Sequence, residues 1–192
     1  MTVVYYGAAS LDGFIADPDD NIDWLIGYQP QPLGEAVEPV GGGHPDDYNE
    51  FYEGIGAMVS GSVTYEWLLE HGGDWPYADK PYWVLSSRSL PAPEGQDVRF
   101  NGSFDEMIAS AGDRKLWVVG GGGVASQFAA AGLLDEVWVT VVPVVLGAGK
   151  PLFDRGLPGG PMRLVGALPR PSGMVELRYE VVDRGRTSTL AG

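Results

Sequence analysis

Four consecutive glycines lie between an apolar, strand-like run and a helix-like stretch. The run covers residues 116–119, the glycines are Gly120, Gly121, Gly122 and Gly123, and the helix-like stretch covers residues 123–131. Glycine lets the backbone adopt a positive φ and approach a ligand closely, and the free N–H groups at a helix start attract an anion. The turn can therefore hold a diphosphate. A tight strand-to-helix connection without a ligand would use the same residues, because the spaced G-x-G-x-x-G pattern is absent.

Hydroxyl groups and an arginine mark the ends of two further strand-like runs. Residues 55–60 lead into Gly61, Ser62 and Thr64, and residues 82–86 end in Ser86, Ser87 and Arg88. Open α/β sheets bind ligands at the carboxyl ends of their strands. Three strand ends with anion-binding groups favour a cofactor that carries phosphate.

These strand ends belong to a pattern in which strands and helices alternate. Eight strand-like runs are predicted at residues 3–9, 55–60, 82–86, 98–100, 116–119, 136–142, 163–167 and 175–182. Four helix-like stretches are predicted at residues 46–52, 63–71, 104–110 and 123–131, the third with Ser103 and Glu106 as a capping box. Alternation indicates βαβ units and a largely parallel sheet, whereas the last two runs, joined only by a turn, should pair antiparallel. The fold class is α/β with a mixed, mostly parallel eight-stranded sheet.

Length and composition predict one domain over residues 1–183 and a flexible tail at residues 184–192. The chain has 192 residues, of which 44% are hydrophobic, and no apolar run long enough to span a bilayer. The first residues enter a strand without a basic, apolar leader, which favours a cytoplasmic location. Residues 27–45 are rich in Gly and Pro and predict a long loop, either a binding loop or an insertion.

The charge and the scarcity of metal ligands exclude several classes of function. A net charge of −14 repels polyanions, so neither nucleic acid nor an anionic membrane is an expected partner. The chain has no cysteine and two histidines, and no metal site is predicted. The expected partner is a small molecule.

Several motifs, taken in their order along the chain, resemble the dihydrofolate reductase-like family. This family includes the reductase domain of the bifunctional riboflavin-biosynthesis deaminase/reductase. The resemblance covers residues 2–182 and implies the family's mixed sheet, NADPH, and hydride transfer to a small heterocycle. The motifs are Ser10-Leu11-Asp12-Gly13-Phe14-Ile15-Ala16, Gly61-Ser62-Val63-Thr64-Tyr65, Leu85-Ser86-Ser87-Arg88, the four-glycine turn, and Leu134-Asp135-Glu136 with Pro143-Val144-Val145-Leu146-Gly147-Ala148-Gly149.

The resemblance implies a set of cofactor residues. Ala8 and Ile15 would flank the nicotinamide, and the helix start that follows Gly61 would hold phosphate through Ser62 and Thr64. The ribose of the adenosine would lie among Ser86, Ser87 and Arg88, and the diphosphate among Gly120, Gly121, Gly122, Gly123 and Val124. Dihydrofolate reductases hold the 2′-phosphate with a basic residue where Ser62 and Val63 stand here, so a preference for NADPH depends on Arg88 and NADH is not excluded.

The substrate side rests on residues 45–51, which resemble the Pro-x-Asp-x-x-x-Phe stretch of dihydrofolate reductases. Asp47 would anchor the heterocycle and assist its protonation, Phe51 would pack against it, and Thr140 would orient Asp47. An aspartate at this position could instead only cap a helix. Asp12 and Trp24 are further substrate-binding candidates, although Asp12 with Gly13 also suits a hairpin turn. Trp67, Trp75, Trp83, Trp117 and Trp138 are predicted to be core or interface residues.

The leading interpretation is an NADPH-dependent reductase of the riboflavin-biosynthesis type, acting on 5-amino-6-(5-phosphoribosylamino)uracil or a similar heterocycle. A dihydrofolate or pteridine reductase is the alternative, because the Arg-x-Asp element of riboflavin-type reductases is missing between Asp46 and Gly61. A nucleotide-binding regulatory module without turnover is the alternative from another class. Apolar residues 133–134 and 137–145, together with the dimeric state of riboflavin-type relatives, predict a homodimer.

Overall fold

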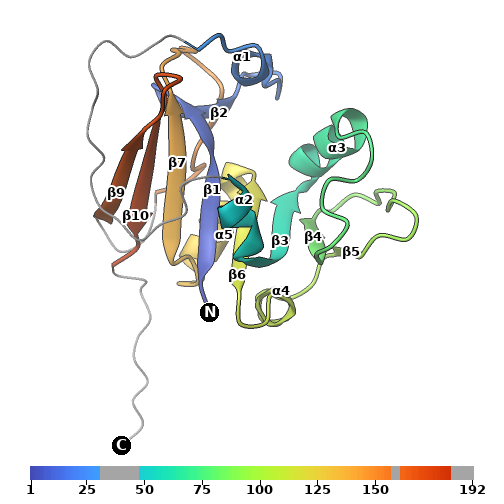
Figure 1. Ribbon diagram of the computed structural model, residues 1–192. Helices are drawn as coiled ribbons and strands as arrows, with labels where there is room; N and C mark the ends of the chain where they lie inside the picture. Colours follow the sequence, from blue (N-terminus) through green and yellow to red (C-terminus); the bar gives the residue numbers. More distant parts are fainter. Residues whose placement is uncertain (31–47, 157–160, 183–192) are drawn as a thin grey trace, which may run out of the picture.

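The computed structural model of the chain describes residues 1–30, 48–156 and 161–182 (Figure 1). In chain order the elements are β1 (Val3–Ser10), β2 (Phe14–Ala16), α1 (Asp23–Ile26), α2 (Tyr48–Glu53), β3 (Ile55–Gly61), α3 (Ser62–His71), β4 (Tyr82–Leu85), β5 (Val98–Phe100), α4 (Phe104–Ser110), β6 (Lys115–Gly120), α5 (Gly122–Ala130), β7 (Glu136–Val142), β8 (Lys150–Pro151), β9 (Arg163–Pro169) and β10 (Val175–Glu180). The tail prediction lies outside the described residues, as does most of the predicted loop at 27–45.

One eight-stranded sheet organises the molecule, with strand order β5-β4-β3-β6-β1-β7-β10-β9. All pairings from β5 across to β7 are parallel, and β10 pairs antiparallel with both β7 and β9. The predicted mixed, mostly parallel sheet and all eight predicted strands are therefore confirmed. The four predicted helices are also present, and Ser103 and Glu106 form the predicted capping box at the start of α4.

Three short elements were not predicted. Strands β2 and β8 form a separate two-stranded sheet, and α1 is a single helical turn of four residues. The prediction that Asp12 and Gly13 close a hairpin is wrong, because β2 pairs with β8 and not with β1. Gly13 N does donate to Ser10 O at 2.9 Å, so the turn itself exists. With two to four residues, β2, β8 and α1 give little periodic signal, whereas the equally short β5 was indicated by Val98 and Phe100.

The two faces of the large sheet bury separate hydrophobic clusters. Helices α4 and α5 cover one face through residues such as Met107 and Phe128, and α2 and α3 cover the other through Phe51 and Tyr65. Of the five tryptophans predicted to be core or interface residues, Trp83, Trp117 and Trp138 are buried, while Trp67 and Trp75 pack at the margin of the second cluster. None of the helices within the described residues is long and apolar enough to cross a membrane.

About half of the residues that suggested a dimer are buried inside the single chain, whereas Val145 at the end of the stretch is 66% exposed. Leu134, Val137, Trp138, Val139 and Val142 are each at most 7% exposed. The buried residues of β7 are apolar because this strand lies inside the sheet, between β1 and β10, and Leu134 packs in the core just before it. The burial weakens the apolar-surface argument for a second copy without removing it, and the homodimer stays a prediction.

Candidate cofactor site at the carboxyl ends of the strands

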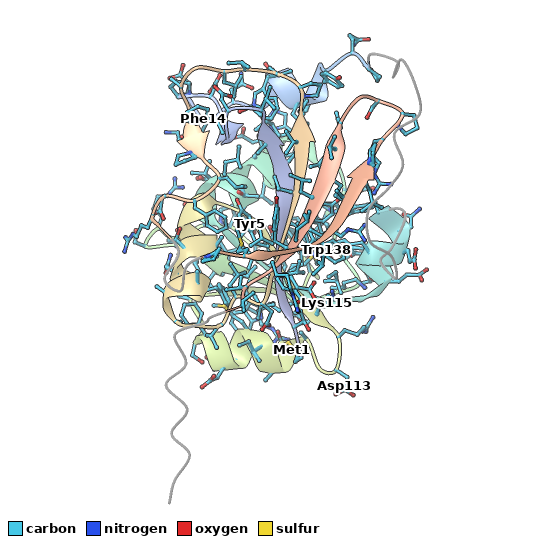
Figure 2. All side chains as sticks on the ribbon, turned by 90° about the vertical axis from the view of Figure 1, so that its left-hand side faces the viewer. Met1, Tyr5, Phe14, Asp113, Lys115 and Trp138 are labelled. Atoms are coloured by element: carbon cyan, nitrogen blue, oxygen red, sulfur yellow. The ribbon has the colours of Figure 1, made fainter. Side chains whose placement is uncertain are left out.

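The two central strands β1 and β6 separate toward their carboxyl ends. Their parallel register ends at Tyr5 and Val118, whereas β1 stays paired with β7 as far as Ser10. Beyond Tyr5 a cavity of about 380 Å³ opens, with Gly7 and Ala8 on the β1 side and Val119 on the β6 side. It lies at the end of the sheet where α1 and β2 are found, away from the N-terminus (Figure 1). Figure 2 shows the same polarity, with Phe14 of β2 at one end and Met1 and Asp113 at the other.

Two helices begin side by side at this cavity. Strands β3 and β6 pair through Ser60 and Gly120 and lead directly into α3 and α5. A Cβ atom added at Gly121 would be 3.8 Å from the backbone nitrogen of Gly61. The residues before the helices, Gly61 and Gly121, supply no side-chain cap. Since the first N–H groups of a helix have no intrahelical partner, two sets of donors and two positive dipole ends converge here. This arrangement suits an anion such as a diphosphate.

The glycine turn allows close packing of neighbouring segments, in addition to the anion binding proposed for it. Gly121 has φ of 88°, a conformation that favours glycine. A Cβ atom at Gly122 would lie 2.6 Å from the carbonyl oxygen of Pro151 and 2.9 Å from that of Leu152, and one at Gly120 would lie 2.7 Å from Thr64 Oγ1. The glycines therefore let three segments approach each other closely. The two interpretations of the turn, tight connection and anion cradle, are compatible.

Most of the residues predicted to hold the cofactor come together around the cavity. Ala8, Ile15, Thr64 and Gly120 to Gly123 line it directly. Val124 is 5% exposed and packs beneath the turn, and a Cβ atom at Gly61 would be 3.5 Å from its side chain. Ser62 follows Gly61 as the first residue of α3. The lining residues that the sequence did not single out are Tyr5, Gly7, Ala16, Asp20, Ile22, Leu25, Val63, Trp67, Val119, Lys150, Pro151 and Asp154.

The short elements supply a charged rim to a cavity with mostly apolar walls. Lys150 Nζ lies 3.3 Å from Asp20 Oδ2, so the ion pair links β8 to the turn after β2. Asp154 lies against the start of α5, where a Cβ atom at Gly123 would be 3.3 Å from its Oδ2. These charges were missed because β2, β8 and α1 give no periodic signal that would have placed them at a strand end.

Ser86, Ser87 and Arg88 lie beside the cavity and do not line it. They continue from β4, whose Leu85 pairs with Gly61 of β3, and so they run next to the start of α3. Ser86 Oγ accepts a hydrogen bond of 2.9 Å from Arg88 N. The Arg88 guanidinium group meets the carboxylate of Glu66 end-on, with Nη1 donating to Oε1 at 2.9 Å and Nη2 donating to Oε2. This ion pair was not predicted.

The predicted substrate residues are not gathered in the same way. Asp47 lies outside the described residues. Phe51 is buried in the core, with its ring centroid 4.8 Å from that of Tyr6. Thr140 is half-buried in β7, in register with Ala8 of β1. Trp24 does not line the cavity, and its buried Nε1 has no hydrogen-bond partner in the part of the chain that is described.

Asp12 holds the loop before β8 through hydrogen bonds to its carboxylate. Its carboxylate accepts hydrogen bonds from Ser10 Oγ at 2.6 Å, Gly147 N at 2.7 Å and Leu146 N at 3.1 Å. These donors, with the Ser10 hydroxyl contributing most, lower the pKa of the Asp12 carboxyl below its ordinary value. Asp12 thereby fixes the loop that leads into β8 and the rim of the cavity.

A buried charged cluster next to Thr140 was not predicted. Glu176, which is in register with Thr140, is 2% exposed, and its Oε1 accepts a hydrogen bond of 2.5 Å from Nε of the equally buried Arg178. Its Oε2 accepts hydrogen bonds from Arg170 at 2.9 Å and from the Tyr6 hydroxyl at 3.1 Å. Burial, followed by the charge of Glu176, raises the pKa of Tyr6. Charged residues at alternate positions of a strand usually lie on a solvated face, and for this reason the buried cluster was not predicted from the sequence.

Comparison with known proteins places the chain in a family. The RibD C-terminal domain family matches residues 79–175. The uncharacterised protein YwjB of Bacillus subtilis is 31% identical over 156 residues, which are 79% of this chain and 82% of YwjB. The chain belongs to the RibD C-terminal domain family. This result confirms the resemblance inferred from the motifs.

Solved structures with the same architecture extend the comparison. A candidate riboflavin biosynthesis protein of Shewanella sp. PV-4 shares 28% identity with a TM-score of 0.73, over 94% of this chain and 98% of that one. Dihydrofolate reductase of Enterococcus faecalis, solved with NADP(H), shares 19% identity with a TM-score of 0.60, over 95% and 97%. A Thermotoga maritima diaminohydroxyphosphoribosylaminopyrimidine deaminase/5-amino-6-(5-phosphoribosylamino)uracil reductase shares 15% identity with a TM-score of 0.60, and this chain covers 56% of it. These likenesses confirm the dihydrofolate reductase-like fold.

Proposed function

We propose that the chain is an oxidoreductase that binds NADPH and transfers hydride to a small heterocycle, in the manner of the riboflavin-biosynthesis reductases. The observation that carries this proposal is the convergence of two helix starts on the cavity between β1 and β6. Family membership and the riboflavin biosynthesis description of the Shewanella protein support it.

The residues at the cavity fit a nicotinamide dinucleotide. The uncapped starts of α3 and α5 offer backbone N–H groups to the diphosphate, and the Thr64 hydroxyl adds a donor between them. Ala8 and Ile15 form apolar walls for a flat ring where β1 and β6 separate. A volume of about 380 Å³ is in the range of small-molecule sites, and it suits the part of the cofactor that enters the sheet.

The bound cofactor would supply the hydride, while the chain binds, orients and excludes water. Tyr5, Val119 and Ile15 enclose the ring site with apolar surface. Beyond Tyr5 the half-buried edge of β1 no longer pairs with the β6 backbone. Tyr6 O accepts a hydrogen bond of 3.0 Å from Trp117 Nε1, so the backbone of Ala8, which lines the cavity, is the part of this edge that can hold a carboxamide. Asp47 and Thr140 remain our proposed proton-handling and orienting groups on the substrate side.

A dihydrofolate or pteridine reductase remains the second enzymatic candidate, because the Enterococcus faecalis enzyme has the same fold over nearly the whole chain. A regulatory module without turnover would keep the cavity and bind the dinucleotide. Turnover separates these possibilities. The chain is expected to act in the cytoplasm as a homodimer, and light scattering that gives the mass of one chain would contradict the dimer.

The test is a calorimetric titration of the protein with NADPH and NADH. Thr64→Val keeps the shape of the side chain and removes its hydroxyl, so affinity should fall roughly tenfold or more if the hydroxyl bonds to a phosphate. Thr2→Val, at the opposite end of β1, is the matched control and should bind normally. Binding by the wild type justifies measuring oxidation of NADPH with dihydrofolate and with 5-amino-6-(5-phosphoribosylamino)uracil. Absence of binding by the wild type to either dinucleotide would refute the proposal.

A further inference from the structure

The adenosine end of the proposed cofactor site presents an arginine that already has a carboxylate partner. Arg88 follows β4, Glu66 lies in the second turn of α3, and the two side chains meet end-on through two hydrogen bonds. Their side chains are 52% and 35% exposed, so a ligand can reach both. The residues that open α3 ahead of Glu66 are Ser62, Val63, Thr64 and Tyr65, none of them charged.

The pair has no net charge, although each member suits a different dinucleotide. An arginine beside the ribose accommodates the 2′-phosphate of NADPH, whereas a carboxylate there accepts a hydrogen bond from the 2′-hydroxyl of NADH. The end-on contact uses one N–H group on each terminal nitrogen of Arg88, so the Nε edge of the guanidinium remains directed away from Glu66. The carboxylate stays close enough to repel a doubly charged phosphate bound at that edge.

We infer that Glu66 sets the dinucleotide preference of this chain by balancing Arg88, so that NADPH and NADH bind with similar affinity. This inference rests on the proposed function, because it requires the adenosine ribose to lie beside the end of β4. Glu66 is a specificity-determining residue that acts on the 2′ position, and it has no part in hydride transfer. The position of Ser86, whose hydroxyl accepts from the backbone of Arg88, fixes the loop that carries the arginine.

The charge of Glu66 can be removed without changing the size of its side chain. In Glu66→Gln the affinity for NADPH should rise about tenfold, because the repulsion of the 2′-phosphate is lost and Arg88 keeps its full charge. The affinity for NADH should stay the same or fall, because an amide is a weaker acceptor for the 2′-hydroxyl. Glu70→Gln is the matched control, one turn further along α3 and exposed, and should change both affinities less than twofold.

The experiment measures dissociation constants of NADPH and NADH by calorimetry for the wild type, Glu66→Gln, Glu70→Gln and Arg88→Gln, at low and moderate salt. Support would be a wild-type ratio within about threefold of one, a shift toward NADPH in Glu66→Gln that weakens with salt, and loss of NADPH affinity alone in Arg88→Gln. A wild type that binds both dinucleotides with a ratio that Glu66→Gln leaves unchanged would overturn the inference and leave the proposed function standing. A wild type that binds neither would overturn both. Thermal unfolding of each variant confirms that it is folded.

Discussion

Asp154 places a negative charge where the proposed diphosphate would bind. It lines the cavity, and its Oδ2 would lie 3.3 Å from a Cβ atom at Gly123 in the first turn of α5. Without a ligand, the carboxylate interacts favourably with the positive end of the helix. With a ligand, it repels the phosphates. Asp154→Asn is therefore expected to change dinucleotide binding and protein stability in opposite directions.

The size of both effects can be estimated for a diphosphate bound at the start of α5. A carboxylate roughly 6 Å from a diphosphate with two negative charges is repelled by about 1.4 kcal/mol at the dielectric constant of water. Partial burial increases this value, since the Asp154 side chain is 42% exposed. Salt reduces it, as does the exposed Arg155 guanidinium, whose Nε lies 4.0 Å from Asp154 Oδ1. Asp154→Asn should therefore bind NADPH about tenfold more tightly. The free protein should lose about 0.3–1 kcal/mol of unfolding free energy, which lowers its Tm by about 1–4 °C.

The assay combines calorimetric titration with thermal unfolding of the free protein. Asp113→Asn is the control, because Asp113 is exposed and lies at the opposite end of the molecule (Figure 2). It should alter neither quantity. Equal or weaker binding of NADPH by Asp154→Asn would refute the reasoning, since it would mean that the carboxylate hydrogen-bonds to the cofactor or lies away from its phosphates.

Three further predictions concern packing, pH and the cavity wall. Gly122→Ala should lower the free energy of unfolding by about 1–3 kcal/mol, because its Cβ atom would overlap the carbonyl oxygens of Pro151 and Leu152. Gly156 has open space around it, so Gly156→Ala should leave the free energy of unfolding, measured with denaturant, nearly unchanged. The pKa of Asp12 is lowered in the folded state, so its contribution to stability is complete above the ordinary carboxyl pKa and is lost as pH falls through the lowered pKa. The difference in Tm between wild type and Asp12→Ala should therefore shrink between about pH 5 and pH 2. A constant difference would contradict this role of Asp12. Trp67 lines the cavity, so Trp67→Phe should reduce the quenching of tryptophan fluorescence by NADPH, whereas Trp75→Phe should not. Equal quenching in both variants would mean that the cofactor binds away from Trp67.

The large sheet and the helices that cover it were predictable from local patterns along the chain. Most of the eight strands are runs of β-branched and aromatic residues long enough to show their pattern, and the three-residue β5 was indicated by Val98 and Phe100. The start of α4 has its own local signal in Ser103 and Glu106. The glycine turn was recognisable from four consecutive glycines between a strand and a helix, and the positive φ of Gly121 is a physical reason for glycine at one of these positions. Local propensity and burial pattern act over a few neighbouring residues, which is why they can be read along the chain.

The tertiary structure alone decided how these elements form a site. The separation of β1 from β6 beyond Tyr5 depends on where a register ends, and no residue in either strand encodes that by itself. Among the rim charges, Lys150 lies in the two-residue β8, and Asp20 and Asp154 lie in irregular segments next to the short elements. The pairing of Glu66 with Arg88 joins residues 22 positions apart. Glu176 and Arg178 look like a solvated strand face in sequence and are buried in the fold. Each of these features depends on which segments become neighbours in space, because charge pairing and burial are set by long-range contacts that a local pattern does not record.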